Sequence, residues 1–424
     1  MVSTLIIIVF CIGYLCIAAE HSVKINKAAT ALVTGVICWT IYMIGGGVGT
    51  EQVNEDLFGH LASISEILFF LLSAMTIVEL VDAHDGFDII TSAIRTRSKV
   101  RLLWIIGLLS FSLSAILDNL TTSIVMVSLL RKLIDDRETR FYYIGMVVIA
   151  ANAGGAWTPI GDVTTTMLWI GHQITAWNIM KVLFLPSLIS MLVPLLLISF
   201  KMKGELSIKL AEKENKKKSL IGERNTIFYL GLSSLICVPI FKTYTNLPPV
   251  MGILLALGIL WIITEIIHRS KPEEKKDAYS VVRALQRVDV TSVLFFLGIL
   301  LAIGALESVG VLHQLATLMD EKVGNISIIV MVTGMASAIV DNVPLVAATM
   351  NMYDLQTYPP DSYLWEFLAY CAGTGGSILI IGSAAGVAAM GMEQISFGWY
   401  LRKIAVYAFA GFFAGAMLYM LMNG

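Results

Sequence analysis

Two aspartate-asparagine pairs stand in the middle of otherwise apolar stretches: Asp118 with Asn119, and Asp341 with Asn342. An ionisable side chain at the centre of an apolar span costs about 2.5–3.5 kcal/mol on insertion scales, so it marks a functional site by default. Carboxylate and amide oxygens are hard ligands, which suit a hard cation such as Na⁺ or Li⁺ better than a soft metal. The plainer interpretation is that both aspartates cap helices at the tips of hairpins.

Hydroxyl side chains accompany both pairs. Ser114 and Ser337 lie four residues before the aspartates, on the same face of the chain if that limb is helical. They are candidate ligands, or donors that hold the ligands in place. Thr122 belongs to the continuation of the first motif, which reads Ser-Ala-Ile-Leu-Asp-Asn-Leu-Thr-Thr, and it joins the candidate set.

A third acidic residue lies in a segment that reads Asn-Ala-Gly-Gly-Ala-Trp-Thr-Pro-Ile-Gly-Asp-Val-Thr-Thr-Thr. Glycine and proline let a helix unwind, and unwound backbone is tolerated at membrane depth only where it lines a buried or aqueous cavity. Freed carbonyls and half-helix ends can then coordinate a cation. The candidate side-chain ligands here are Asn152, Thr158, Asp162 and Thr164. Tight packing through small residues would explain the glycines but not a buried aspartate.

A matching segment, from Gly373 to Ser383, breaks a later apolar run. It supplies Thr374 and Ser377 as candidate ligands. It has no aspartate, so the two breaks are not chemically equivalent. No Lys or Arg occurs in 141–180 or in 323–401, and the acids of both regions are therefore expected to have no basic partner.

Composition excludes several classes of protein. Of the 424 residues, 57% are hydrophobic and 14% are charged, which is far more apolar than a soluble multi-domain enzyme. The net charge of −2 shows no excess of positive charge of the kind that binds nucleic acid. The cysteines form no disulfide framework or zinc spacing, and no HExxH, GxSxG or P-loop motif stands in a working context. We therefore expect neither an enzyme nor a bound cofactor.

The apolar runs predict a polytopic helical membrane protein, since a span needs about 20 residues. Basic clusters flank both ends of 102–130, the stretch around the first aspartate, so the positive-inside rule predicts that it enters and returns without crossing. If 324–352 does the same from the other side, all Lys and Arg except Lys181, Lys242 and Lys322 fall on the cytoplasmic side. The predicted spans are 2–19, 27–47, 62–82, 139–172, 177–200, 226–242, 248–268, 289–308, 364–391 and 404–422.

The two halves of the chain repeat. Ser-Ala-Ile-Leu-Asp-Asn-Leu at 114–120 matches Ser-Ala-Ile-Val-Asp-Asn-Val at 337–343, with a Phe-Phe-Leu before each copy and a Gly-Gly break after it. The charge count gives the copies opposite orientations, which predicts an inverted-topology repeat with two re-entrant hairpins and two discontinuous helices. The predicted divisions are 1–26, a first transmembrane helix; 27–200, a first repeat with inward-opening hairpin 102–130; 201–225, a charged cytoplasmic linker; and 226–424, a second repeat with outward-opening hairpin 324–352.

At these motifs the chain resembles the NhaD-type sodium/proton antiporters of the ion-transporter superfamily, over nearly its whole length. The dicarboxylate branch of that superfamily carries Ser-Asn-Thr at the hairpin tips, whereas this chain has Asp118-Asn119-Leu120 and Asp341-Asn342-Val343. The resemblance implies exchange of Na⁺ or Li⁺ for H⁺, a role in pH homeostasis, and a homodimer with scaffold and transport regions.

We therefore expect a secondary transporter in which H⁺ and Na⁺ exclude one another at buried aspartates, with alternating access. Asp341 and Asp118 are expected to carry the exchange, and Asp162 to take part in ion binding or proton transfer. The expected location is a bacterial inner membrane with both termini outside. The alternatives are a sodium-coupled dicarboxylate or oxyanion carrier, a passive channel, and an intramembrane aspartyl protease, whose Gly-x-Gly-Asp context is absent.

Overall fold

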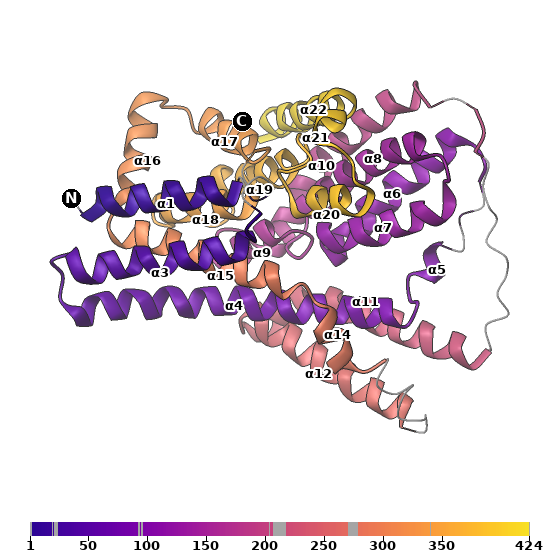
Figure 1. The fold of residues 1–424 in the computed structure, drawn as a ribbon, viewed down its shortest axis with the longest axis horizontal. Coiled ribbons are helices and arrows are strands. Elements are labelled where there is room, and N and C mark those ends of the chain that lie inside the picture. Colours follow the sequence, from indigo (N-terminus) through magenta and orange to yellow (C-terminus); the bar gives the residue numbers. More distant parts are fainter. Residues whose placement is uncertain are drawn as a thin grey trace.

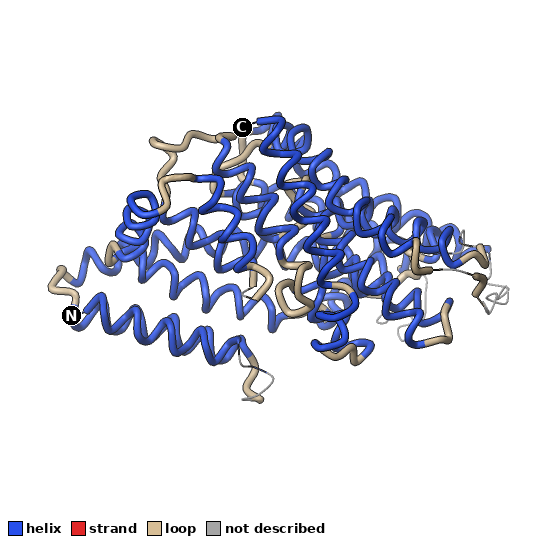
Figure 2. The backbone as a smooth tube through the Cα atoms, turned by 90° about the horizontal axis from the view of Figure 1, so that it is seen from above, coloured by secondary structure: helices blue, strands red, loops and turns tan. Residues whose placement is uncertain are grey.

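The computed structural model confirms the all-α polytopic fold. Every named element in the described part of the chain is a helix, and Figure 2 shows these helices joined by loops with no strand among the described residues. The description covers residues 2–423 with the exception of 19, 21–23, 92–93, 95, 203, 207–217, 270–278 and 340.

Long apolar helices make up most of the molecule. Within the described residues, eight helices are long and apolar enough to cross a membrane. Large apolar side chains remain exposed on them, for example Ile44 and Leu421, as lipid-facing surfaces require. These helices are α3 (Lys27–Gly45), α4 (Thr50–Ala83), α6 (Lys99–Leu117), α10 (Ala176–Ser199), α11 (Lys218–Thr245), α12 (Pro249–His268), α15 (Val290–Ser308) and α22 (Ala405–Asn423).

Helices break at the two Asp-Asn pairs and at the two Gly-rich segments identified in the sequence. The first Asp-Asn pair separates α6 from α7 (Asn119–Leu133), and the second separates α17 (Ile326–Ala336) from α18 (Asn342–Met352). The two Gly-rich segments separate α8 (Arg137–Ala156) from α9 (Val163–Ile170), and α19 (Tyr363–Gly375) from α20 (Ala384–Glu393). Each second half starts with a side-chain cap, provided by Asp118, Asp341, Asp162 and Ser383.

The remaining helices connect these parts. Helix α11 begins at Lys218, inside the predicted linker 201–225, and residues 207–217 of that linker lie outside the described residues. The connecting and terminal helices are α1 (Val2–Ala18), α5 (Asp88–Thr91), α14 (Val281–Arg287), α16 (Val311–Lys322) and α21 (Phe397–Lys403).

The two broken helices form the centre of the fold. Helices α8 and α19 are buried along most of their length, and in Figure 1 their breaks lie between the α6–α7 pair at one end of the long axis and the α17–α18 pair at the other. A Cβ atom added at Gly154 would lie 2.2 Å from the carbonyl oxygen of Phe111, and one at Gly375 would lie 2.1 Å from that of Gly334. Only glycine permits each hairpin limb to approach its broken helix this closely.

Candidate ion-binding site

Asp162 is the centre of a buried hydrogen-bond network. It caps α9 by accepting from the backbone N of Thr164 at 2.8 Å and from the Thr164 hydroxyl at 2.7 Å. The amide of Asn119, at the start of α7, donates to its other oxygen. The amide of Asn342, at the start of α18, lies 3.4 Å from Asp162 Oδ1. One carboxylate thus receives donors from both interrupted segments, one from each half of the chain.

Asn152 extends this network to the second break. Its Oδ1 accepts from Asn119 Nδ2 at 3.2 Å, and its Nδ2 donates to Ser383 Oγ at 3.1 Å. Ser383 caps α20 by accepting from the backbone N of Gly386 at 3.2 Å. The sequence analysis did not include Ser383 among the candidate ligands. The available signal was its place after Gly382, which matches the place of Asp162 after the glycine of the first break.

Asp118 occupies a strained position at the hairpin tip. Its backbone has φ +79° and ψ 159°, a region that costs a residue other than glycine about 1–3 kcal/mol. Its carboxylate accepts from the backbone N and the hydroxyl of Thr121, each at 2.8 Å. Asp118 and Asn119 line a cavity of about 50 Å³, whose other walls include Phe70 of α4 and Phe296 of α15. The walls of this cavity are mainly apolar.

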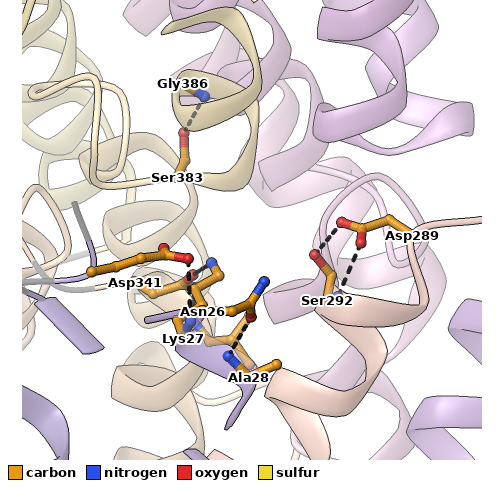
Figure 3. Close-up of polar contacts among 10 residues, drawn as sticks. Asn26, Lys27, Ala28, Asp289, Ser292, Asp341, Ser383 and Gly386 are labelled. Atoms are coloured by element: carbon orange, nitrogen blue, oxygen red, sulfur yellow. Dashed lines mark hydrogen bonds and ion pairs between the residues drawn. The ribbon is translucent and has the colours of Figure 1, made fainter. Parts of the chain in front are cut away.

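Asp341 has a basic partner, so the expectation of acids without one is wrong for this region. Lys27 Nζ lies 3.5 Å from Asp341 Oδ2, and Figure 3 shows the two side chains directed toward each other. The other oxygen of Asp341 accepts from the backbone N of Val343 at 3.3 Å. Lys27 is 314 residues away in the chain, at the start of α3, so counting charges near the motif could not find it.

Most of the candidate hydroxyls donate to backbone carbonyls. Ser114 donates to Ala151 at 2.6 Å, and Ser337 donates to Ala372 at 3.0 Å, so each hairpin is attached to the broken helix of its own half. Thr122 differs, because its buried hydroxyl has no hydrogen-bond partner among the described residues. The other bonds run from Thr158 to Ala115 at 2.7 Å, from Thr374 to Tyr370 at 2.6 Å, and from Ser377 to Thr374 at 2.7 Å.

The three aspartates interact through their charges but do not form one compact metal site. Asp162 lies within electrostatic reach of both Asp118 and Asp341. No group of three or more His, Cys, Asp or Glu side chains in the described part of the chain is arranged to hold a metal ion. One carboxylate among neutral oxygens can match the charge of a monovalent cation, whereas sites for divalent cations usually gather several carboxylates.

A charged cluster outside the apolar core joins the two halves. Glu393, at the end of α20, accepts from Arg131 of α7 and from Arg140 of α8, the latter at 2.9 Å, and its side chain is only 3% exposed. Arg137 donates to its backbone carbonyl at 3.2 Å. Burial alone would raise the pKa of Glu393, but the hydrogen bonds and charges of Arg131 and Arg140 outweigh it and hold that pKa below its ordinary value.

Comparison with known proteins gives the family. The family model described as a citrate transporter matches residues 6–366. The chain belongs to this transporter family. It is 50% identical to Sodium/proton antiporter 1 of Arabidopsis thaliana over 422 residues. The aligned region covers 98% of this chain and 72% of that relative. Sodium/proton antiporter 2 of the same plant is 47% identical, with coverage of 98% and 99%.

A bacterial relative carries the name that the motifs suggested. The Na⁺/H⁺ antiporter NhaD of Halomonas elongata is 30% identical over 451 residues, which covers 98% of this chain and 87% of the relative. The predicted resemblance to the NhaD-type antiporters is therefore confirmed at the level of family. Together with the eight apolar helices, it makes this chain a multi-pass membrane protein of a transporter family.

Proposed function

We propose that this protein exchanges Na⁺ or Li⁺ for H⁺ across a membrane by competition at buried aspartates. The observation that carries the proposal is the position of Asp162, whose carboxylate receives amides from Asn119 and Asn342. A proton and a small cation neutralise the same charge on the same oxygens, so binding of one excludes the other. Asp118 and Asp341 are the acids through which ions and protons enter and leave this site. The names of the antiporter relatives support the same exchange.

The asparagines suit this competition because an amide offers either a donor or an acceptor. In the structure their Nδ2 groups face Asp162, since amide N–H groups donate to a carboxylate, which only accepts. When a cation binds, rotation of each amide presents its oxygen in place of the donors. The cation then has the carboxylate of Asp162 and the oxygens of Asn119 and Asn342, and the hydroxyl of Thr122 is a further candidate.

Alternating access follows from the way the interrupted segments meet. The α6–α7 and α17–α18 pairs lie toward opposite ends of the molecule (Figure 1). The hydrogen bond from Asn152 to Ser383 joins the Asp162 network to the second break. We propose that the halves are inverted repeats, with both termini outside, and that each hairpin controls access from one side. The matched bonds of Ser114 and Ser337 to the two broken helices support this arrangement. The NhaD resemblance adds the proposal of a homodimer in a cell membrane.

The test uses purified protein in liposomes with an acidic interior and a pH-sensitive dye inside. Addition of Na⁺ or Li⁺ outside is expected to raise the interior pH, whereas K⁺ is expected to have little effect. Asp341→Asn and Asp162→Asn are expected to lose the response, and Asp136→Asn, an exposed acid at the start of α8, is expected to keep it. If wild-type protein that is folded by size-exclusion chromatography gives no response between pH 6 and 9, the proposal is wrong.

A sodium-coupled carrier of citrate or a similar anion is the second candidate, because the matching family model is described as a citrate transporter. Three aspartates in the site would repel such an anion unless cations bound first. Saturable uptake of labelled citrate that depends on Na⁺, without a change of interior pH, would select this candidate. Proton movement that citrate does not affect would select the antiporter.

A further inference from the structure

Lys27 and Asp341 belong to two different helical segments, α3 and α18, which both pack on α15. Lys27 is the first residue of α3, and its backbone N donates to Glu20 at 3.1 Å. Helix α3 packs along α15, where the indole N of Trp39 donates to the carbonyl of Leu301 at 2.8 Å. Asp341 belongs instead to the interrupted segment α17–α18. The ion pair therefore joins the start of α3 to the tip of the second hairpin.

The ammonium group of Lys27 has a second support beside the carboxylate. It lies 4.4 Å from the centre of the Phe295 ring, on α15, where the face of the aromatic ring attracts a cation. This contact keeps the lysine close to Asp341 even when the ion pair opens. Figure 3 shows Lys27 reaching Asp341 from the start of α3, next to the Asn26 cap of that helix.

The ion pair is loose enough to be displaced. Its separation of 3.5 Å is longer than the 2.7–2.9 Å of a strong charge-assisted hydrogen bond. The side chains of Lys27 and Asp341 are 21% and 17% exposed, so most of each is buried. For such a pair the cost of desolvating both charges offsets much of their attraction, so the net contribution is small. A cation that brings several oxygen ligands together can compete with it.

We propose that Lys27 is a tethered competitor of the transported cation at Asp341. The inference rests on the proposed exchange and adds its regulation. In the cation-free protein the ammonium neutralises Asp341, and an arriving Na⁺ must displace it toward the Phe295 ring. Two results follow: Lys27 lowers the apparent affinity for Na⁺, and it returns to Asp341 when the cation leaves, which favours release. Because Lys27 stays with α3 while Asp341 belongs to the hairpin, movement of the hairpin changes the strength of this competition.

The test compares Lys27→Gln with Lys24→Gln, which removes an equal charge from an exposed position three residues earlier. In the liposome assay, Lys27→Gln is expected to lower the Na⁺ concentration at half-maximal response about three- to tenfold, which corresponds to about 0.7–1.4 kcal/mol of competition removed. Lys24→Gln and Lys27→Arg are expected to stay within twofold of the wild type, because both keep a cation at Asp341. Lys27→Met, which keeps the stem that packs on Phe295, is a second neutral variant should Lys27→Gln not fold.

The outcomes separate this inference from the exchange itself. If the wild type exchanges Na⁺ for H⁺ but the folded neutral variants keep the wild-type half-maximal concentration or raise it, the competitor role is wrong and the exchange stands. If the wild type does not exchange Na⁺ for H⁺, the competition is measured instead by the Na⁺ concentration that gives half of the thermal stabilisation of each purified variant. A lower half-maximal concentration in the neutral variants than in the wild type supports the competitor role. An unchanged value overturns it.

Discussion

Asp162 and Ser383 occupy the same place in the two broken helices with almost the same backbone conformation. Asp162 has φ −145° and ψ 146° at the start of α9, and Ser383 has φ −144° and ψ 153° at the start of α20. Asn152 and Asn119 connect the two positions through hydrogen bonds. One position carries a charge and the other a neutral hydroxyl, so the pair carries a single negative charge, which equals the charge of one monovalent cation in magnitude.

This asymmetry predicts unequal effects of removing the two side chains. Asp162→Asn is expected to reduce cation-driven proton movement at least about a hundredfold, because an ionised ligand at contact contributes several kcal/mol. Ser383→Ala removes two neutral hydrogen bonds, from Asn152 and from the backbone N of Gly386, and is expected to raise the half-maximal Na⁺ concentration only about threefold. Initial rates in liposomes, measured over a range of Na⁺ concentrations, provide both values. Equal losses in the two variants would show that the charge at Asp162 has no special role.

Thr122 allows a ligand role to be separated from a structural one. Its buried hydroxyl has no partner among the described residues, so Thr122→Val, which keeps the shape, is expected to leave the thermal stability unchanged or slightly higher. If the hydroxyl binds the cation, the same variant is expected to raise the half-maximal Na⁺ concentration about tenfold, or about 1.4 kcal/mol.

The control for Thr122 is a hydroxyl outside the interrupted segments. Ser187 of α10 also has a buried hydroxyl without a partner among the described residues. Ser187→Ala is expected to leave the half-maximal Na⁺ concentration unchanged. An equal effect of both variants, or a large loss of stability in Thr122→Val, would contradict the ligand role of Thr122.

Local patterns predicted the helices and their breaks well. An acidic residue in an apolar run, followed by residues that can start a helix, predicts both a functional side chain and a cap, and Asp118, Asp162 and Asp341 have the cap role in the structure. The two interpretations of the hairpin aspartates are thus compatible. Glycines marked both breaks, and Pro159 marked the first, because both residue types weaken a helix. They are not sufficient by themselves, since α10 continues through Pro186 and Pro194.

Contacts between distant segments could not be predicted in this way. Lys27 reaches Asp341 across 314 residues, and neither the spacing nor the local charge count contains that contact. Ser383 is not distinguished by local sequence from the other hydroxyls of its segment, Thr374 and Ser377, and only the packing of the two breaks brings it to Asn152. The free hydroxyl of Thr122 depends on which groups surround it, which only the packed structure determines.

We expect the buried ion cluster at Glu393 to stabilise the protein by linking the two halves of the chain. Glu393→Gln leaves Arg140, which is 15% exposed, without its carboxylate, whereas Arg131 is 47% exposed and can be solvated. Loss of hydrogen bonds between charged groups is expected to cost about 1.5–3 kcal/mol and to lower the apparent melting temperature of the purified protein by several degrees. Glu138→Gln, an exposed acid on α8, is the control, and a decrease as large in this variant would contradict the assignment.

The contribution of this cluster to the stability of the protein is expected to depend on pH. Because the pKa of Glu393 is lowered in the folded protein, the cluster stabilises fully above the ordinary glutamate pKa of about 4.3 and loses its contribution as the pH falls through the lower folded value. Arg131 and Arg140 keep their charges throughout this range. The difference in melting temperature between wild type and Glu393→Gln should therefore stay constant from pH 8 to pH 5 and decrease only below about pH 4. A decrease already between pH 7 and pH 6 would mean that the carboxylate is not held by the two arginines, and the link between α20 and the first half would then have to rest on other contacts.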